Sequence, residues 1–270
     1  MGKEKKFGLI GGGNMGEALV KGLIQSGEAG PREIIVSEPL AARRDYLKNE
    51  YQVAVEADNK AVIQAAPVII LAVKPQVMAK VLDNIRAEVT SNHLIISIAA
   101  GVKLETIQSA FGPGVPVVRA MPNTPALSLS GATAIAPGNH ASKDDLKMAR
   151  TLFEAVGIVV EVEEKSMDAV TALSGSGPAY VFVFMEALTD AGVLEGLPRD
   201  QAFLLACQTI LGSAKLAREA GASPALLKDK VTSPAGTTIA GLMVLEKGGL
   251  RGLVMEAVKA AAERSKELGG

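Results

Sequence analysis

A glycine-rich segment near the start of the sequence has the residue types and spacing of a loop that binds a pyrophosphate. It follows an expected strand, opens an expected helix and fits the pattern G-x-G-x-x-G. The first glycine permits a tight turn, the second lets a pyrophosphate approach the backbone, and the third lets helix and strand pack closely. Free N–H groups at the helix start then face the anion, although a purely structural turn is the alternative. The residues concerned are Gly11, Gly12, Gly13, Asn14, Met15 and Gly16.

Residues after the second expected strand give conflicting indications about which dinucleotide binds. A carboxylate at Glu38 suits the ribose 2′-hydroxyl of NAD and repels the 2′-phosphate of NADP. Ser37, Arg43 and Arg44 would instead attract that phosphate. Alternatively, Glu38 caps the next helix and the arginines form a solvated face. The sequence therefore leaves the cofactor preference open.

A second segment, residues 233–239, combines hydroxyl side chains with the start of an apolar helix. Ser233 and Thr237 are residue types that cap helices, and the helix is expected to begin near Thr237. Unpaired backbone N–H groups at such a start suit a carboxylate. A plain helix cap, whose loss costs about 1 kcal/mol, is the alternative.

Other reactive residue types give weaker indications. Lys74 follows a strand, but Pro75 fixes its backbone, so we favour a positioning role over general catalysis. His93 and His140 lie in polar loop contexts and, without a Cys/His cluster, no metal site is expected. The single cysteine, Cys207, cannot form an internal disulfide, which indicates a reducing, cytoplasmic compartment.

Composition narrows the classes of function. The 270 residues are 48% hydrophobic and carry a net charge of -1, which supports a packed core and argues against a general nucleic-acid binder. No secretory signal is expected at the N-terminus. No uninterrupted apolar run approaches the roughly 18 residues that span a membrane, so we attribute the hydrophobicity to a subunit interface.

The first half alternates apolar strands with helical stretches, which is the pattern of a parallel sheet covered on both faces. We expect a doubly wound α/β domain over residues 1–163. Helices are expected at 14–25, 41–50 and 143–155. Strands are expected at 7–10, 33–37, 68–73, 94–99, 116–120, 132–136 and 157–162.

The second half, residues 164–270, is expected to be entirely helical. Helices are predicted over 167–174, 178–192, 198–220, 224–231, 237–247 and 250–268. Two segments, 178–188 and 201–216, are apolar nearly all round, and such a helix must be buried on all sides. A bundle of this size hardly buries so much alone, so we predict intertwined dimerisation; one crowded monomeric core is the alternative.

Several motifs, read together and in order, resemble those of the pyrroline-5-carboxylate reductase family along the whole chain. They are Ile10–Gly16, Ala72–Pro75, Ser97–Val102, Arg119–Pro125, Ser174–Tyr180 and Ser233–Ile239. The resemblance implies reduction of 1-pyrroline-5-carboxylate to L-proline, the last step of proline biosynthesis, by hydride transfer from NADP(H), with NAD(H) as the alternative cofactor. It also implies an N-terminal Rossmann-type domain, a C-terminal all-α dimerisation domain and a homodimer, with a ring of dimers such as a decamer allowed.

The resemblance also implies site residues. The phosphate loop would hold the pyrophosphate, and the adenosine ribose would contact Ser37, Glu38 and Asn59. The nicotinamide ribose would contact Ala72, Val73, Lys74, Pro75, Ala99, Ala100 and Gly101. The substrate would contact Ser233, Gly236, Thr237 and Thr238, and Thr238 would act in catalysis by offering its hydroxyl to the ring nitrogen.

A glycine- and serine-rich segment, residues 174–180, allows two interpretations. Gly175 and Ser176 would present backbone groups to the substrate or nicotinamide, or the segment would be a tight turn between helices. Two departures from the family pattern are visible. Many members have glycine where this chain has Ala235, and Glu38 replaces a small hydroxyl residue, which weighs against a strict NADPH preference.

Three rival functions are compatible with a Rossmann-type domain. A β-hydroxyacid dehydrogenase would need a catalytic lysine after a glycine-rich turn in the second domain, and Lys215 and Lys228 lack that context. A non-catalytic dinucleotide sensor or scaffold would not need the 233–238 loop. A methyltransferase would use a similar glycine loop for S-adenosylmethionine.

Overall fold

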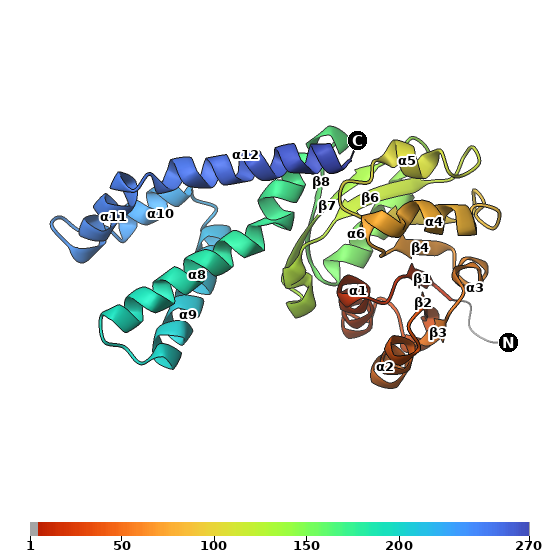
Figure 1. The fold of residues 1–270 in the computed structure, drawn as a ribbon, viewed down its shortest axis with the longest axis horizontal. Coiled ribbons are helices and arrows are strands. Elements are labelled where there is room, and N and C mark those ends of the chain that lie inside the picture. Colours follow the sequence, from red (N-terminus) through yellow and green to blue (C-terminus); the bar gives the residue numbers. More distant parts are fainter. Residues whose placement is uncertain (1–4, 270) are drawn as a thin grey trace. The chain divides into compact units, whose positions relative to one another are not determined.

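The computed structural model describes residues 5–269, which form two compact units (Figure 1). The sheet unit comprises residues up to Ser176 together with the chain from Ala260 onward, and the helical unit comprises Gly177–Lys259. The expected domain boundary, between residues 163 and 164, was placed where the composition changes. The compact sheet unit also includes residues 164–176, because Met167 and Ala172 are buried and Met167 packs with strand residues.

The sheet unit is built on eight strands in the order β3-β2-β1-β4-β5-β6-β7-β8. Strands β1 to β6 run parallel in the strand order of a dinucleotide-binding fold, which confirms the predicted doubly wound class. The strands are β1 (Phe7–Ile10), β2 (Ile34–Ser37), β3 (Ala54–Glu56), β4 (Val68–Leu71), β5 (Leu94–Ser97), β6 (Val117–Met121), β7 (Gly131–Pro137) and β8 (Gly157–Glu161).

Two features of the sheet differ from the expectation. Strand β3 was not predicted, because its three residues are only partly buried and carry no continuous apolar run. The sheet is not wholly parallel, since β7 runs antiparallel to β6. A short 3-10 segment, Thr124–Ser128, joins these strands, and a connection without a crossover helix returns the chain in the opposite direction.

Helices cover both faces of the sheet and enclose two apolar cores. One core lies under α1 (Asn14–Gln25), α2 (Ala41–Tyr51) and α6 (Lys143–Glu154). The other lies under α3 (Asn59–Ala65), α4 (Pro75–Ile85) and α5 (Leu104–Gln108). Because side chains alternate along a strand, neighbouring strand residues such as Leu9 and Ile10 belong to opposite cores.

The strand register aligns the carboxyl ends of neighbouring parallel strands. Ile10 at the end of β1 pairs with Ser37 at the end of β2 and with Leu71 at the end of β4. Leu71 in turn pairs with Ser97 at the end of β5. The segments that follow these four residues therefore leave the sheet along a single edge, where ligands of open α/β sheets bind.

The chain from residue 164 onward is helical, as predicted. A short helix, α7 (Met167–Val170), precedes the helical unit. That unit contains α8 (Gly177–Leu194), α9 (Arg199–Ala220), α10 (Pro224–Lys230), α11 (Thr237–Lys247) and the first part of α12 (Leu250–Leu268). The last part of α12 belongs to the sheet unit, where the buried Ser265 hydroxyl lies 2.7 Å from the Asp168 carboxylate.

The helical unit leaves much of its apolar surface uncovered. Within it only Thr189, Ala202 and Ala206 are buried, whereas side chains such as Phe182 and Val183 on α8 are exposed. One helical stretch, Glu164–Leu194, has the length and composition to cross a membrane, with a mean hydropathy of 1.2 and 6% of the apolar window buried. This criterion uses length and composition alone, and the stretch contains no uninterrupted apolar run of about 18 residues, so the expectation from such runs is not contradicted.

Candidate active site

The phosphate loop connects β1 to α1, and close backbone contacts explain two of its glycines. Gly11 has a φ of +106°, and a Cβ there would lie 2.5 Å from the Ala72 carbonyl oxygen. A Cβ at Gly16 would lie 2.3 Å from the Gly11 carbonyl oxygen. Both contacts are with backbone, which cannot rotate away as a side chain can. The loop therefore requires glycine at these positions to bring α1 against the sheet.

Gly13 lies on the open side of the same loop. A Cβ at this position would meet no atom within 4 Å, so no protein neighbour requires glycine there. Gly13 and Asn14 are exposed, and α1 begins at Asn14 with Gly13 as its N-cap and no side-chain cap. The first N–H groups of a helix have no partner within the helix. The loop thus offers open space and backbone donors suited to a pyrophosphate.

The end of β2 places Ser37 and Glu38 beside this loop. Ser37 is buried, and its hydroxyl donates to the Asn59 amide oxygen at 2.8 Å, so two of the predicted adenosine contacts meet. The Glu38 carboxylate accepts hydrogen bonds from the Gly12 N–H at 3.0 Å and the Leu40 N–H at 3.1 Å. Glu38 therefore binds the phosphate loop itself as well as the entrance to α2.

Arg43, one of the two arginines that follow the end of β2, is bound to other groups of the protein. Arg43 donates to the Gly12 carbonyl at 2.6 Å and pairs with Glu17 on α1. The Glu17 carboxylate also accepts from the hydroxyls of Tyr46 and Tyr51, each at 2.8 Å. Burial alone would raise the pKa of Glu17, but these three donors lower it. Burial and the same carboxylate raise the pKa of Tyr51.

The loops after β4 and β5 continue the same edge of the sheet. The Ala72 N–H donates to the Ile10 carbonyl at 2.8 Å, which extends the pairing of β4 with β1. Lys74 is the N-cap of α4 and Pro75 its first residue, where the missing N–H costs nothing. Gly101 is buried and has a φ of +76°. The predicted nicotinamide-ribose residues on these two loops are Ala72, Val73, Lys74, Pro75, Ala99, Ala100 and Gly101.

The segment with Gly175 and Ser176 is not a turn between two helices. Residues Thr171–Gly175 form a π-helical segment that joins α7 to α8, with the Ser176 N–H bonded to the Thr171 carbonyl at 2.8 Å. The chain stays helical through this segment, so the interpretation as a tight turn is wrong. Such segments are frequent at functional sites.

Asn123 is a residue whose role the sequence analysis missed. Its amide nitrogen donates to the Ser174 carbonyl at 3.0 Å, and its amide oxygen accepts from the Ala132 N–H at 2.9 Å. Pro178 lacks the N–H that would normally bond the carbonyl four residues earlier, which is that of Ser174. Asn123 supplies the missing donor. Nothing in the sequence signalled this, because a proline at the first position of an expected helix needs no donor.

In the helical unit, the 233–238 loop leads directly into α11, which begins at Thr237 as predicted. The N-cap is Gly236 and no side chain caps the helix, so the expectation that Ser233 or Thr237 forms a cap is wrong. A Cβ at Gly236 would lie 2.2 Å from the Ser233 hydroxyl, a side-chain group that can rotate away, so this contact alone does not require glycine. Thr238 is half-buried. The first N–H groups of α11 therefore have no side-chain cap.

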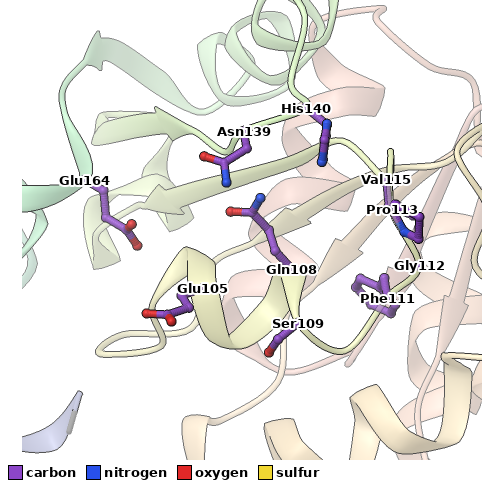
Figure 2. A pocket seen from close by; sticks show the side chains of 10 residues that line it. All are labelled: Glu105, Gln108, Ser109, Phe111, Gly112, Pro113, Val115, Asn139, His140 and Glu164. Carbon is purple, nitrogen blue, oxygen red and sulfur yellow. The ribbon is translucent and has the colours of Figure 1, made fainter.

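One cavity of the sheet unit lies away from these residues. It has a volume of about 510 Å³ and lies between α5 and the segment after β7 (Figure 2). Figure 2 shows polar side chains around it, among them Gln108, Asn139 and Glu164. None of its lining residues was predicted to contact cofactor or substrate. Within residues 5–269, no group of three or more His, Cys, Asp and Glu side chains is placed to hold a metal ion.

Relatives with known names match the chain over almost its whole length. A family model described as pyrroline-5-carboxylate reductase dimerisation matches residues 164–268. A pyrroline-5-carboxylate reductase from Synechocystis sp. is 54% identical over 264 residues, covering 98% of each chain. The chain belongs to the pyrroline-5-carboxylate reductase family. One from Methanosarcina acetivorans is 49% identical over 267 residues, covering 99% of each chain.

Solved structures agree with this family. The pyrroline-5-carboxylate reductase of Coxiella burnetii matches with a TM-score of 0.92 and 39% identity, over 99% of this chain and 100% of the other. The Plasmodium falciparum pyrroline carboxylate reductase with NADP bound matches with a TM-score of 0.89 and 35% identity, over 100% of each chain.

The family and its fold class are therefore those that the sequence motifs predicted. A second family model, described as NADP oxidoreductase coenzyme F420-dependent, matches residues 6–101, which include the phosphate loop and the loops after β2, β4 and β5. The match of residues 164–268 to a dimerisation domain indicates an oligomer. It also accounts for the apolar side chains that the helical unit leaves exposed.

Proposed function

We infer that this chain reduces 1-pyrroline-5-carboxylate to L-proline, the final step of proline biosynthesis, with a reduced nicotinamide dinucleotide, NAD(P)H, as hydride donor. The observation that carries this conclusion is 54% identity to a pyrroline-5-carboxylate reductase over 98% of both chains. Hydride transfer to a protonated imine needs little covalent help from protein side chains. The chain must bind and orient the two reactants and exclude water.

The carboxyl edge of the sheet suits a dinucleotide. We propose that the loop from Gly11 to Gly16 binds the pyrophosphate, since Gly13 leaves open space beside unpaired helix N–H groups. The pair formed by Ser37 and Asn59 would contact the adenosine ribose. The loops after β4 and β5 would contact the nicotinamide ribose. When bound, the nicotinamide supplies the hydride.

The start of α11 suits the small anionic substrate. Its backbone N–H groups have no side-chain cap, and a carboxylate is the group that a free helix N-terminus favours. We propose that Ser233, Gly236 and Thr237 bind the substrate and that the Thr238 hydroxyl bonds the ring nitrogen. Gly175 and Ser176 are proposed to contribute backbone groups from the π-helical segment.

The test is the turnover of purified protein with pyrroline-5-carboxylate and either nicotinamide. Thr238→Ala should reduce turnover about ten- to a hundredfold, since loss of one hydrogen bond costs a few kcal/mol at most. Thr238→Ser retains a hydroxyl and should recover most of the rate. An unchanged rate in Thr238→Ala would remove this residue from the mechanism. A well-folded wild-type protein with no turnover would favour a dinucleotide-sensing scaffold instead.

The finer organisation is also a proposal. We propose a cofactor domain over residues 1–163 and a domain for dimerisation and substrate binding over residues 164–270. The chain would act in the cytoplasm as a homodimer or as a ring of dimers such as a decamer. Light scattering of the purified protein would distinguish these assemblies by mass.

A further inference from the structure

The Glu38 carboxylate is held in place at the ribose edge of the candidate cofactor site. Glu38 is 8% exposed, and each of its carboxylate oxygens accepts one backbone N–H, from Gly12 and from Leu40. Because both oxygens are engaged, moving the carboxylate away would leave two donors without their partner. A negative charge is therefore fixed beside the phosphate loop.

Arg43, a cation in the first turn of α2, is held by other groups. Its Nε donates to the Gly12 carbonyl at 2.6 Å, and its terminal nitrogen pairs with Glu17. Its guanidinium also lies 4.9 Å from the ring centroid of Tyr46. The hydroxyls of Tyr46 and Tyr51 fix the Glu17 carboxylate, so Arg43 faces an immobilised partner.

Arg44 is anchored to the backbone of the same turn. One of its terminal nitrogens donates to the Glu38 carbonyl at 2.7 Å and to the Pro39 carbonyl at 2.9 Å. These bonds fix the strand-to-helix turn that presents the Glu38 carboxylate. Arg44 therefore supports the position of Glu38, which the sequence alone could not show.

We propose that this chain prefers NADH to NADPH because Glu38 repels a 2′-phosphate while Glu17 holds Arg43 away from it. The inference deepens the proposed function, since it places the adenosine ribose at the end of β2. A phosphate monoester carries a charge of about -1.5 to -2 at neutral pH, so a fixed carboxylate beside it is strongly unfavourable. The ribose 2′-hydroxyl, in contrast, can donate to the same carboxylate.

The experiment measures dissociation constants of NADH and NADPH by fluorescence titration, together with kcat/KM for each cofactor. The wild-type protein should favour NADH by about tenfold or more. Glu38→Gln removes the charge at constant size and should shift this ratio toward NADPH by about ten- to a hundredfold. Asp45→Asn is the control, because it removes an exposed charge on α2, the helix that follows Glu38, and should leave the ratio unchanged.

The role of Glu17 is tested separately. Glu17→Gln should weaken the hold on Arg43 and improve NADPH binding by about three- to tenfold. The gain should vanish in the double variant Glu17→Gln/Arg43→Met. A persistent gain would show that Arg43 is not the released phosphate ligand and would overturn this half of the proposal.

Other outcomes separate the selectivity from the reaction. A wild-type preference for NADPH, or an unchanged ratio in Glu38→Gln, would overturn the selectivity. Because the titration needs no second substrate, tight NADH binding without imine reduction would contradict the proposed function and leave the selectivity intact. If Glu38→Gln does not fold, the ratio of NADH to NADPH affinity is compared between the wild-type protein and Glu38→Ser, which tests the role of Glu38 in the same way.

Discussion

The sheet unit and the helical unit differ in where their stability comes from. The sheet unit encloses two cores, and its candidate cofactor loop is shaped by close contacts within the chain, such as that of Gly16 with Gly11. The helical unit has few buried residues and exposes large apolar side chains on α8, α9 and α11. The sheet unit thus buries its apolar cores within one chain, whereas the helical unit depends on another surface to cover its helices.

The largest expected effect is on assembly. Val183 on α8 and Leu40 beside α2 are each 67% exposed, so exposure alone does not distinguish them. Val183→Asp should weaken association at least a hundredfold, because an unpaired carboxylate in an apolar interface costs several kcal/mol. Leu40→Asp should leave the mass unchanged. Sedimentation velocity over a concentration series measures the mass of each variant. Equal masses for the two variants would contradict the idea that assembly covers the helical unit and not the sheet unit.

The next effect lies within the phosphate loop. Gly16→Ala places a Cβ 2.3 Å from the Gly11 carbonyl oxygen and should lower the free energy of unfolding by about 3 kcal/mol. Gly13→Ala meets no protein atom within 4 Å and should leave that free energy nearly unchanged while weakening dinucleotide binding. Chemical denaturation and cofactor titration separate the two effects. A Gly13→Ala protein with normal cofactor affinity would remove the pyrophosphate from this position.

The parts of the fold that could be predicted from the sequence are those dictated by local pattern. Buried strands appear as continuous apolar runs, so β1, β2, β4 and β5 were located within a few residues. Helix α11 was predicted with its observed bounds, because a glycine precedes it and an apolar run follows. The reversal of β7 was not predictable from such runs, since strand direction depends on the connection as well as on the strand.

In the candidate site, too, only features that follow from a local sequence pattern could be predicted. The steric reasons for Gly11 and Gly16 follow from the loop pattern and are present in the structure. The bond from the Gly12 N–H to Glu38 was not predictable, because the two residues lie in separate segments that meet only in the folded sheet. The link from Asn123 to the Ser174 carbonyl was missed for the same reason.

A moderate effect is expected from pH through Glu17. Its pKa is lowered below the ordinary value of 4.5, so the ionised form is stabilised by folding. The contribution is complete above the ordinary pKa and is lost as the pH falls through the lowered value. Glu17→Gln should therefore cost about 2 kcal/mol at pH 7 and progressively less below about pH 4. Denaturation of both proteins from pH 7 to pH 3 measures the difference, and a constant difference would contradict this linkage.

The smallest expected effect is at Ala235, in the helical unit. Its φ of +56° lies in the left-handed region, where a Cβ costs about 1–2 kcal/mol. Ala235→Gly relieves that strain but adds about 0.5–1 kcal/mol of chain entropy to the unfolded state. The free energy of unfolding should therefore rise by about 0.5–1 kcal/mol. Ala240→Gly, inside α11, is the matched control and should lower it by about 1 kcal/mol. A decrease of equal size in both variants would mean that the loop does not hold Ala235 in this conformation in solution.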